Sequence, residues 1–156
     1  MRALYFFRVL IISVEAFLIG VSELVWYLFS ADLNHLATTI KLNDDILKYL
    51  MLVPVGLAVW VATELRQLLQ EDKGTTRFLM GWPDYWKLKL HLWVSLIYAV
   101  VFVCISIAPW VVQAGISTGI GLLLFLTSIV GQITLSASVY AASLRVKELL
   151  SNAPDF

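Results

Sequence analysis

Long apolar runs separated by short polar stretches dominate the pattern of hydrophobic and polar positions along the chain. A membrane-spanning helix needs about 20 mostly apolar residues, because each residue rises about 1.5 Å and the hydrocarbon core is about 30 Å thick. Four runs meet this length. They predict an all-α integral membrane protein, a four-helix bundle in one domain over residues 1–156, with spans at 3–29, 46–69, 88–112 and 116–144.

The composition agrees with a membrane protein, since 60% of the residues are hydrophobic and only 14% are charged. A soluble domain typically has about 45–50% apolar and about 25% charged residues. The formal net charge of +0 provides no overall attraction to nucleic acid, so we expect no direct nucleic-acid binding. The single cysteine, Cys104, excludes a disulfide or a thiol relay within one chain.

Lysines and arginines are distributed unevenly over the segments between the predicted spans. One side has only Lys41 and Lys48. The other side has Arg2, Arg8, Arg66, Lys73, Arg77, Lys87, Lys89, Arg145 and Lys147. Because basic residues collect on the cytoplasmic side, this bias predicts that both termini and the loop 66–89 are cytoplasmic. We expect a bacterial inner membrane from the short length, the strong bias and the lack of a sorting signal.

Two glutamates, Glu15 and Glu23, lie inside the first apolar run. A charged side chain near the bilayer centre costs roughly 2.5–3.5 kcal/mol, so it usually faces a bundle interior, a partner or a water-filled path. On one continuous helix, Arg8, Glu15 and Glu23 share a broad face, with Glu15 close to mid-bilayer. Three interpretations stay open: hydrogen bonding between helices, proton or cation handling by Glu15, and a contact between subunits.

The fourth run contains a stripe of small and hydroxylated residues at helical spacing, which predicts close helix packing or oligomerisation. The stripe consists of Thr127, Gly131, Thr134 and Ser138, continued by Arg145. Gly115 and Gly119 form a Gly-x-x-x-Gly pair at its outer end, a pattern found at tight helix crossings. Gln132 lies off the stripe, and its amide needs a partner, which a second subunit could supply.

The inner loop is rich in aromatic and basic residues. Its candidate residues are Arg77, Trp82, Tyr85, Trp86, Lys87 and Lys89, and the C-terminal segment adds Arg145 and Lys147. Aromatic rings of this kind suit the headgroup layer, so the loop is interpreted as a membrane anchor. The alternative is a docking surface for a cytoplasmic protein.

No pattern of residues points to a metal, a cofactor or an enzyme. Asp32, His35, Asp44 and Asp45 are potential ligands near the outer loop, but their spacing fits no calcium loop or zinc motif. Phosphate-binding loops, nucleophile elbows and zinc-protease motifs are missing from the sequence. We therefore expect no metal site, no cofactor and no enzymatic activity.

Four spans with a glutamate in the first are also found in small multidrug exporters, which this chain resembles in these two respects. It differs from them in the long inner loop 66–89 and in the strong charge bias, so the resemblance assigns no family.

The sequence favours a homo-oligomeric membrane scaffold or sensor that presents its basic, aromatic inner face to a cytoplasmic partner. Subunits of this kind occur in envelope-stress, immunity and antiviral (phage-defence) modules, a link that rests on analogy alone. The alternative function is a small oligomeric ion channel or proton-coupled transporter that uses Glu15 and Glu23.

Overall fold

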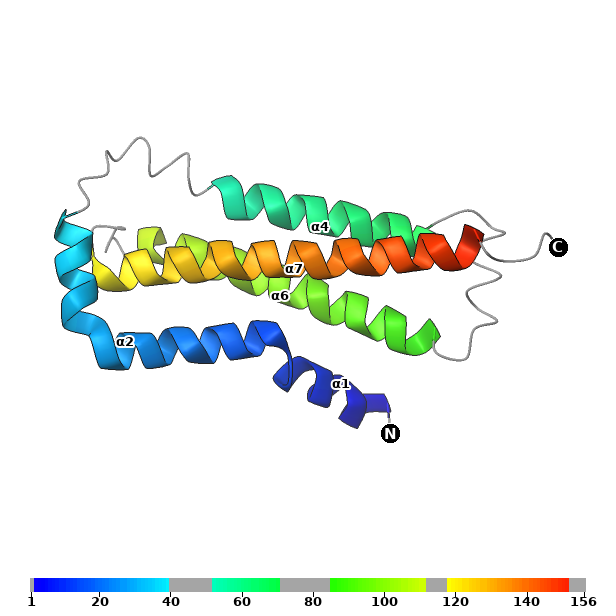
Figure 1. Cartoon of the computed structure of the whole chain (residues 1–156), viewed down its shortest axis with the longest axis horizontal. Coiled ribbons are helices and arrows are strands. Elements are labelled where there is room, and N and C mark those ends of the chain that lie inside the picture. The colour runs from blue at the N-terminus through cyan, green and yellow to red at the C-terminus, as the bar shows by residue number, and fades with distance from the viewer. Residues whose placement is uncertain (1, 40–51, 71–84, 112–117, 152–156) are drawn as a thin grey trace.

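The computed structural model describes residues 2–39, 52–70, 85–111 and 118–151, and these are almost entirely helical. Its helices are α1 (Arg2–Ile11), α2 (Val14–Thr39), α4 (Leu52–Gln70), α6 (Tyr85–Val111) and α7 (Gly119–Ser151). Helices α4, α6 and α7 run along the long axis of the molecule, and α2 runs along the other side of α7 (Figure 1). Helix α7 therefore contacts α2, α4 and α6, whereas α1 contacts α6.

Three of these helices are long and apolar enough to cross a membrane, over Val14–Thr39, Tyr85–Pro109 and Gly119–Glu148. Helix α4 covers the second predicted run from Leu52 onward and ends one residue beyond it, while the first residues of the run, 46–51, lie outside the described residues. The coarse prediction, an all-helical protein with long apolar helices suited to a bilayer, is confirmed.

The core lies where α4, α6 and α7 meet. Phe102 of α6 and Leu135 of α7 are fully buried there, together with Val61 of α4. Gly131 of α7 packs directly on Phe102, and a Cβ atom at position 131 would overlap the phenyl ring. The small residue thus lets α6 and α7 approach closely, as small residues do at helix contacts in membrane proteins.

The first apolar run forms two helices, in contrast to the single helix expected over 3–29. Helix α1 ends at Ile11, and α2 begins at Val14. The Ser13 hydroxyl accepts a hydrogen bond from the Ala16 N–H at 3.0 Å, and the Ser13 carbonyl accepts one from the Phe17 N–H at 3.1 Å. Ser13 is therefore the N-cap of α2. Because Arg8 lies on the other helix, it does not share one continuous helix face with Glu15 and Glu23.

Helix α2 continues past the expected end of the first span. It bends at Phe29, whose φ of -125° and ψ of 23° are not helical, and residues 30–39 turn across the end of the bundle (Figure 1). There the Asn34 side-chain oxygen accepts a hydrogen bond from the Gly119 N–H at 2.9 Å. This contact with the start of α7 gives structure to a segment that its polarity alone predicts as a loop.

Candidate functional site

A cavity of about 790 Å³ lies between the α1–α2 junction, α6 and α7. Its polar lining residues are Ser13 and Glu15 from the junction, His91, Ser95 and Tyr98 from α6, and Ser138 and Arg145 from α7. The other lining residues are aliphatic. His91, Ser138 and Arg145 are exposed, so the cavity is open to the outside of the bundle. The structure thus brings Glu15 and Arg145 to one cavity, although they are 130 positions apart in the sequence.

The helix break positions Glu15. With Ser13 as N-cap, Glu15 falls in the first turn of α2, where the helix dipole stabilises a negative charge. The residue is half-buried. Within the described parts of the chain, its carboxylate forms no hydrogen bond and no ion pair. Glu15 thus lines the cavity with its acceptor oxygens available.

Tyr98 connects α6 to the same break. In a continuous helix the Leu10 carbonyl would accept a hydrogen bond from the Val14 N–H, but the break removes this donor. The buried Tyr98 hydroxyl donates to the Leu10 carbonyl oxygen in its place, and the Ser13 hydroxyl donates to it at 3.4 Å. The cavity wall thus satisfies the backbone group that the break exposes.

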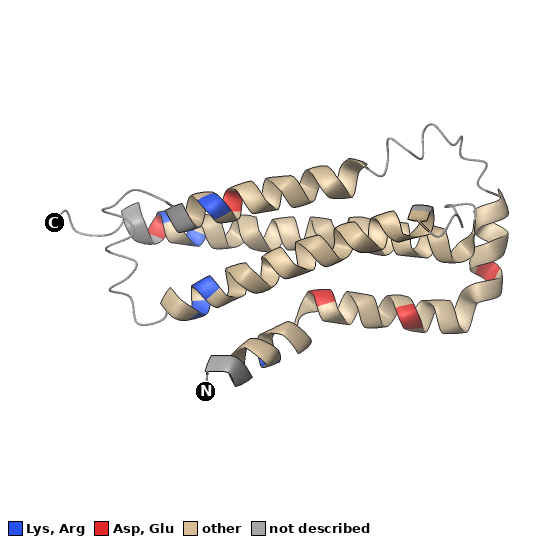
Figure 2. Ribbon diagram, turned by 180° about the vertical axis from the view of Figure 1, so that it is seen from behind, with Lys and Arg blue, Asp and Glu red and all other residues tan. Residues whose placement is uncertain are grey.

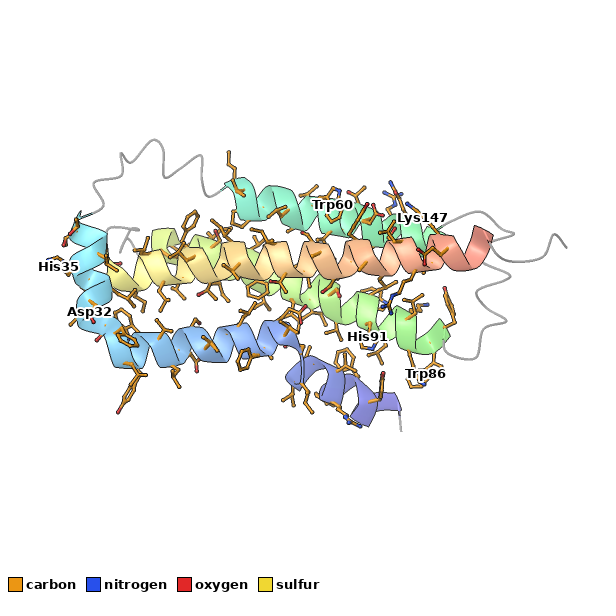
Figure 3. The ribbon with its side chains drawn as sticks, in the orientation of Figure 1. Asp32, His35, Trp60, Trp86, His91 and Lys147 are labelled. Atoms are coloured by element: carbon orange, nitrogen blue, oxygen red, sulfur yellow. The ribbon has the colours of Figure 1, made fainter. Side chains whose placement is uncertain are left out.

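Aromatic contacts attach α1 to the start of α6. The Tyr5 hydroxyl lies 3.4 Å from His91 Nε2, and the Tyr5 ring meets the Trp86 ring edge-on at a centroid distance of 5.3 Å. Figure 3 labels Trp86 and His91 near the beginning of α6. Lys87 Nζ lies 5.9 Å from the centroid of the Trp86 ring. Trp86 and Lys87, which the sequence indicates for partner docking, are engaged in contacts within the chain.

The predicted stripe of α7 divides into two parts. Ser138 and Arg145 lie seven residues, or two helical turns, apart and both line the cavity. Thr127 and Thr134 donate their hydroxyl hydrogens to the Leu123 and Val130 carbonyl oxygens of their own helix, each at 2.8 Å. The residues of the stripe therefore do not share one packing surface. Gly131 packs on α6, whereas Ser138 and Arg145, at the C-terminal end of the stripe, line the cavity.

Gln132 is fully buried and joins α7 to α6. Its Nε2 donates to the Ala99 carbonyl oxygen at 2.8 Å, and one turn earlier the Ser128 hydroxyl donates to the Phe102 carbonyl oxygen at 2.6 Å. The side-chain oxygen of Gln132, Oε1, has no hydrogen-bond partner among the described residues. The amide thus has a partner within the chain, and its donor needs no second subunit.

The remaining candidate residues do not join the cavity. Glu23 is exposed on α2, and Arg8 is exposed on α1. Lys89 and Lys147 are exposed, and Tyr85 packs against the core. The candidates Arg77, Trp82 and Gly115 lie outside the described residues.

Basic residues gather at the end of the bundle where α4 and α7 end and α6 begins (Figure 2). The basic residues of these helices are Arg66, Lys87, Lys89, Arg145 and Lys147, and they outnumber the acidic residues of the same helices, Glu64 and Glu148. The acidic residues of α2, Glu15, Glu23 and Asp32, are spaced along the helix toward the opposite end. Two residues that line the cavity, Leu88 and Arg145, lie at this basic end.

Sequence reasoning missed several residues of the cavity. Ser13 is a residue type common at helix starts, but the capping-box position three residues later is Ala16, so the sequence does not mark a helix break there. Nothing in the sequence places His91 opposite Tyr5. Tyr98 carries no signal at all, since its role depends on the position of Leu10.

The potential metal ligands of the outer loop do not form a cluster in the described chain. Asp32 and His35 are exposed on α2, while Asp44 and Asp45 lie outside the described residues. In the described segments, no three side chains of the His, Cys, Asp or Glu type lie close enough together to hold a metal ion.

No protein-family model, curated protein or solved structure matches this chain. Its class follows from the fold alone: a helical integral membrane protein, with a charged, open cavity at the basic end of its bundle.

Proposed function

We propose that the protein is a small four-span scaffold or sensor subunit of a bacterial inner membrane. Both termini are cytoplasmic, copies of the chain assemble into a homo-oligomer, and the basic end binds a soluble protein partner. The observation that carries this proposal is the gathering of basic side chains at one end of the bundle (Figure 2). By the positive-inside rule this end faces the cytoplasm.

The exposed residues of that end favour a docking role. Lys89 at the start of α6 and Lys147 near the end of α7 are exposed, so their charges are available to an acidic partner. Helix α2 supports assembly, because Ala37 is its one buried residue and several of its large apolar side chains, among them Phe17, Leu24 and Leu28, are exposed. That surface suits lipid or a second copy of the chain.

Co-purification tests the docking role. The protein is extracted gently from its host, and the recovered proteins and the native mass are measured for wild type and for Lys89→Gln with Lys147→Gln. We expect a defined oligomer with a stoichiometric partner, and several-fold lower partner recovery for the double variant. Asp32→Asn, which changes one charge on α2 away from the basic end, is the control. Equal recovery from all three proteins would refute docking at the basic end.

A second candidate function is a small oligomeric channel or proton-coupled transporter that uses Glu15 and Glu23. The observation that favours it is the helix break beside Glu15, because broken helices in membranes are tolerated where they are buried in protein or line a cavity. Glu23 is exposed outside the cavity, so a path through both glutamates needs a neighbouring copy. Flux into proteoliposomes that survives Glu15→Gln and Glu23→Gln would exclude this function.

A further inference from the structure

We propose that the open cavity binds a zwitterionic aminophospholipid, with the lipid ammonium at Glu15, the phosphate at Arg145 and an acyl chain along the aliphatic wall. This site is separate from the exposed lysines that the docking proposal uses, so either proposal can fail while the other stands.

The size and lining of the cavity fit an amphiphile. Its volume of about 790 Å³ lies within the range of about 300–1,000 Å³ usual for ligand sites, which are mostly apolar with a few placed polar groups. Val9, Ile12, Leu92, Val139 and Val146 belong to the aliphatic wall. This wall provides no hydrogen-bonding side chains, and it therefore suits a hydrocarbon chain.

The two charges of the cavity select a zwitterion. Glu15 projects from α2 and Arg145 from α7, and in the described chain they form no ion pair with each other. The carboxylate of Glu15 is half-buried, and a charge shielded from water is costly unless it is paired, while the exposed Arg145 guanidinium is available to a ligand. A simple cation would leave Arg145 without a partner, and a simple anion would leave Glu15 without one. A ligand that carries both charges pairs both residues.

The chemistry of each group assigns the orientation. Arginine binds phosphate through parallel N–H···O bonds, so the phosphate belongs at Arg145. A primary ammonium has three donor hydrogens, and the Glu15 carboxylate accepts from them. A quaternary ammonium has no such hydrogens. The site should therefore prefer phosphatidylethanolamine to phosphatidylcholine.

The position of the cavity matches a lipid of the inner leaflet. Its α6 wall extends from Leu88 to Tyr98, which corresponds to about 15 Å along the helix. It begins at the basic end and reaches inward to Tyr98, beside the α1–α2 junction that carries Glu15, so the headgroup lies along the cavity between Arg145 and Glu15. Because His91, Ser138 and Arg145 are exposed, a lipid can enter from the side.

Lipid retention tests the proposal. The full-length protein is reconstituted in vesicles of phosphatidylcholine mixed with phosphatidylethanolamine or with phosphatidylglycerol, which lacks the ammonium, and retained lipids are measured by native mass spectrometry. We expect wild type to retain phosphatidylethanolamine preferentially. Glu15→Gln should lower its retention about tenfold while retention of phosphatidylglycerol is unchanged. Arg145→Gln should lower retention of both lipids.

Matched variants control for general effects. Glu23 lies on the same helix as Glu15 but outside the cavity, and Lys147 lies two residues from Arg145 and does not line the cavity. The variants Glu23→Gln and Lys147→Gln should therefore retain lipid as wild type does. Glu15→Asp keeps the charge in the first turn of α2 and should retain more phosphatidylethanolamine than Glu15→Gln. Equal retention by these two Glu15 variants would overturn the role of the carboxylate even if both variants were less stable.

Two further measurements test the identity of the ligand, namely displacement by a soluble headgroup and retention of phosphatidylglycerol. Soluble phosphoethanolamine should not displace the lipid, because it lacks the acyl chain that fills the aliphatic wall. Displacement by it would overturn the lipid assignment, and wild-type protein that retains phosphatidylglycerol as well as phosphatidylethanolamine would overturn the ammonium site.

Discussion

The hydroxyl of Tyr98 in α6 donates a hydrogen bond to the backbone carbonyl oxygen of Leu10 at the end of α1. The two residues are 88 positions apart, and the acceptor is the carbonyl that the break before α2 deprives of its helical donor. The hydrogen bond therefore holds the α1–α2 junction against α6, and Tyr98 lines the same cavity as Glu15.

Tyr98→Phe should loosen the α1–α2 junction. The substitution removes the hydroxyl and leaves the Leu10 carbonyl with the longer bond from Ser13 alone, at a cost of about 1–3 kcal/mol of stability. Hydrogen exchange of residues 8–17 should become faster. Tyr140→Phe, at an exposed position of α7, is the control and should leave exchange unchanged. Identical protection of the junction in both variants would mean that the bond does not hold α1.

Gly131→Ala should destabilise the bundle by about 1–3 kcal/mol, because its Cβ would overlap the Phe102 ring in the core. Thermal unfolding in detergent measures the effect. Gly56→Ala in α4 is the matched control, since a Cβ there meets no atom within 4 Å, and alanine favours a helix by about 0.5–1 kcal/mol over glycine. Combining Gly131→Ala with Phe102→Leu should recover part of the loss. A Gly131 variant as stable as the Gly56 variant would argue against the close contact.

Gly119→Leu tests whether this glycine serves assembly or the fold of one chain. The structure places it against Asn34, where a Cβ would lie 2.6 Å from the Asn34 backbone nitrogen. The substitution should therefore separate α2 from the start of α7 and lower the melting temperature. Asn34→Ala, which removes the 2.9 Å hydrogen bond to the Gly119 N–H, should act in the same direction but more weakly. Loss of oligomer mass without loss of thermal stability would instead indicate a contact between subunits.

Ser143→Ala should cost about 1.5–3 kcal/mol of stability, because the buried Ser143 hydroxyl donates to Glu64 Oε1 at 2.7 Å and joins α7 to α4. Ser136→Ala in the same helix is the matched control. The Ser136 hydroxyl oxygen is buried and has no hydrogen-bond partner among the described residues, so its removal should be neutral or slightly stabilising. Equal unfolding temperatures for the two variants would show that the bond to Glu64 contributes little.

The glutamates show how far the sequence predicts the candidate site. Their position in an apolar run marked Glu15 and Glu23 as unusual, and depth along a continuous helix singled out Glu15, but neither observation shows which glutamate lines a cavity. In the structure Glu15 lines the cavity, whereas Glu23 is exposed. The difference arises from the break at Ser13 and from the position of α7, which no periodicity within the first run can indicate.

Arg145 shows the same limit. The sequence assigns it both to the α7 stripe and to a surface for a partner, while the structure directs it to the cavity. Helical spacing correctly relates Arg145 to Ser138, because both belong to one helix. Spacing cannot say which helix packs opposite that face, and the chemistry of the site depends on this.

The sequence by itself determined the helical class, the long apolar helices and the uneven distribution of basic residues, because length, hydropathy and charge are properties of continuous segments. Only the tertiary structure decided where the first run breaks, how α2 bends onto α7 and which polar groups share a cavity. These features depend on contacts between segments far apart in the chain, such as Tyr98 with Leu10 and Asn34 with Gly119. Such contacts satisfy backbone groups that a local pattern treats as helical or as solvated loop.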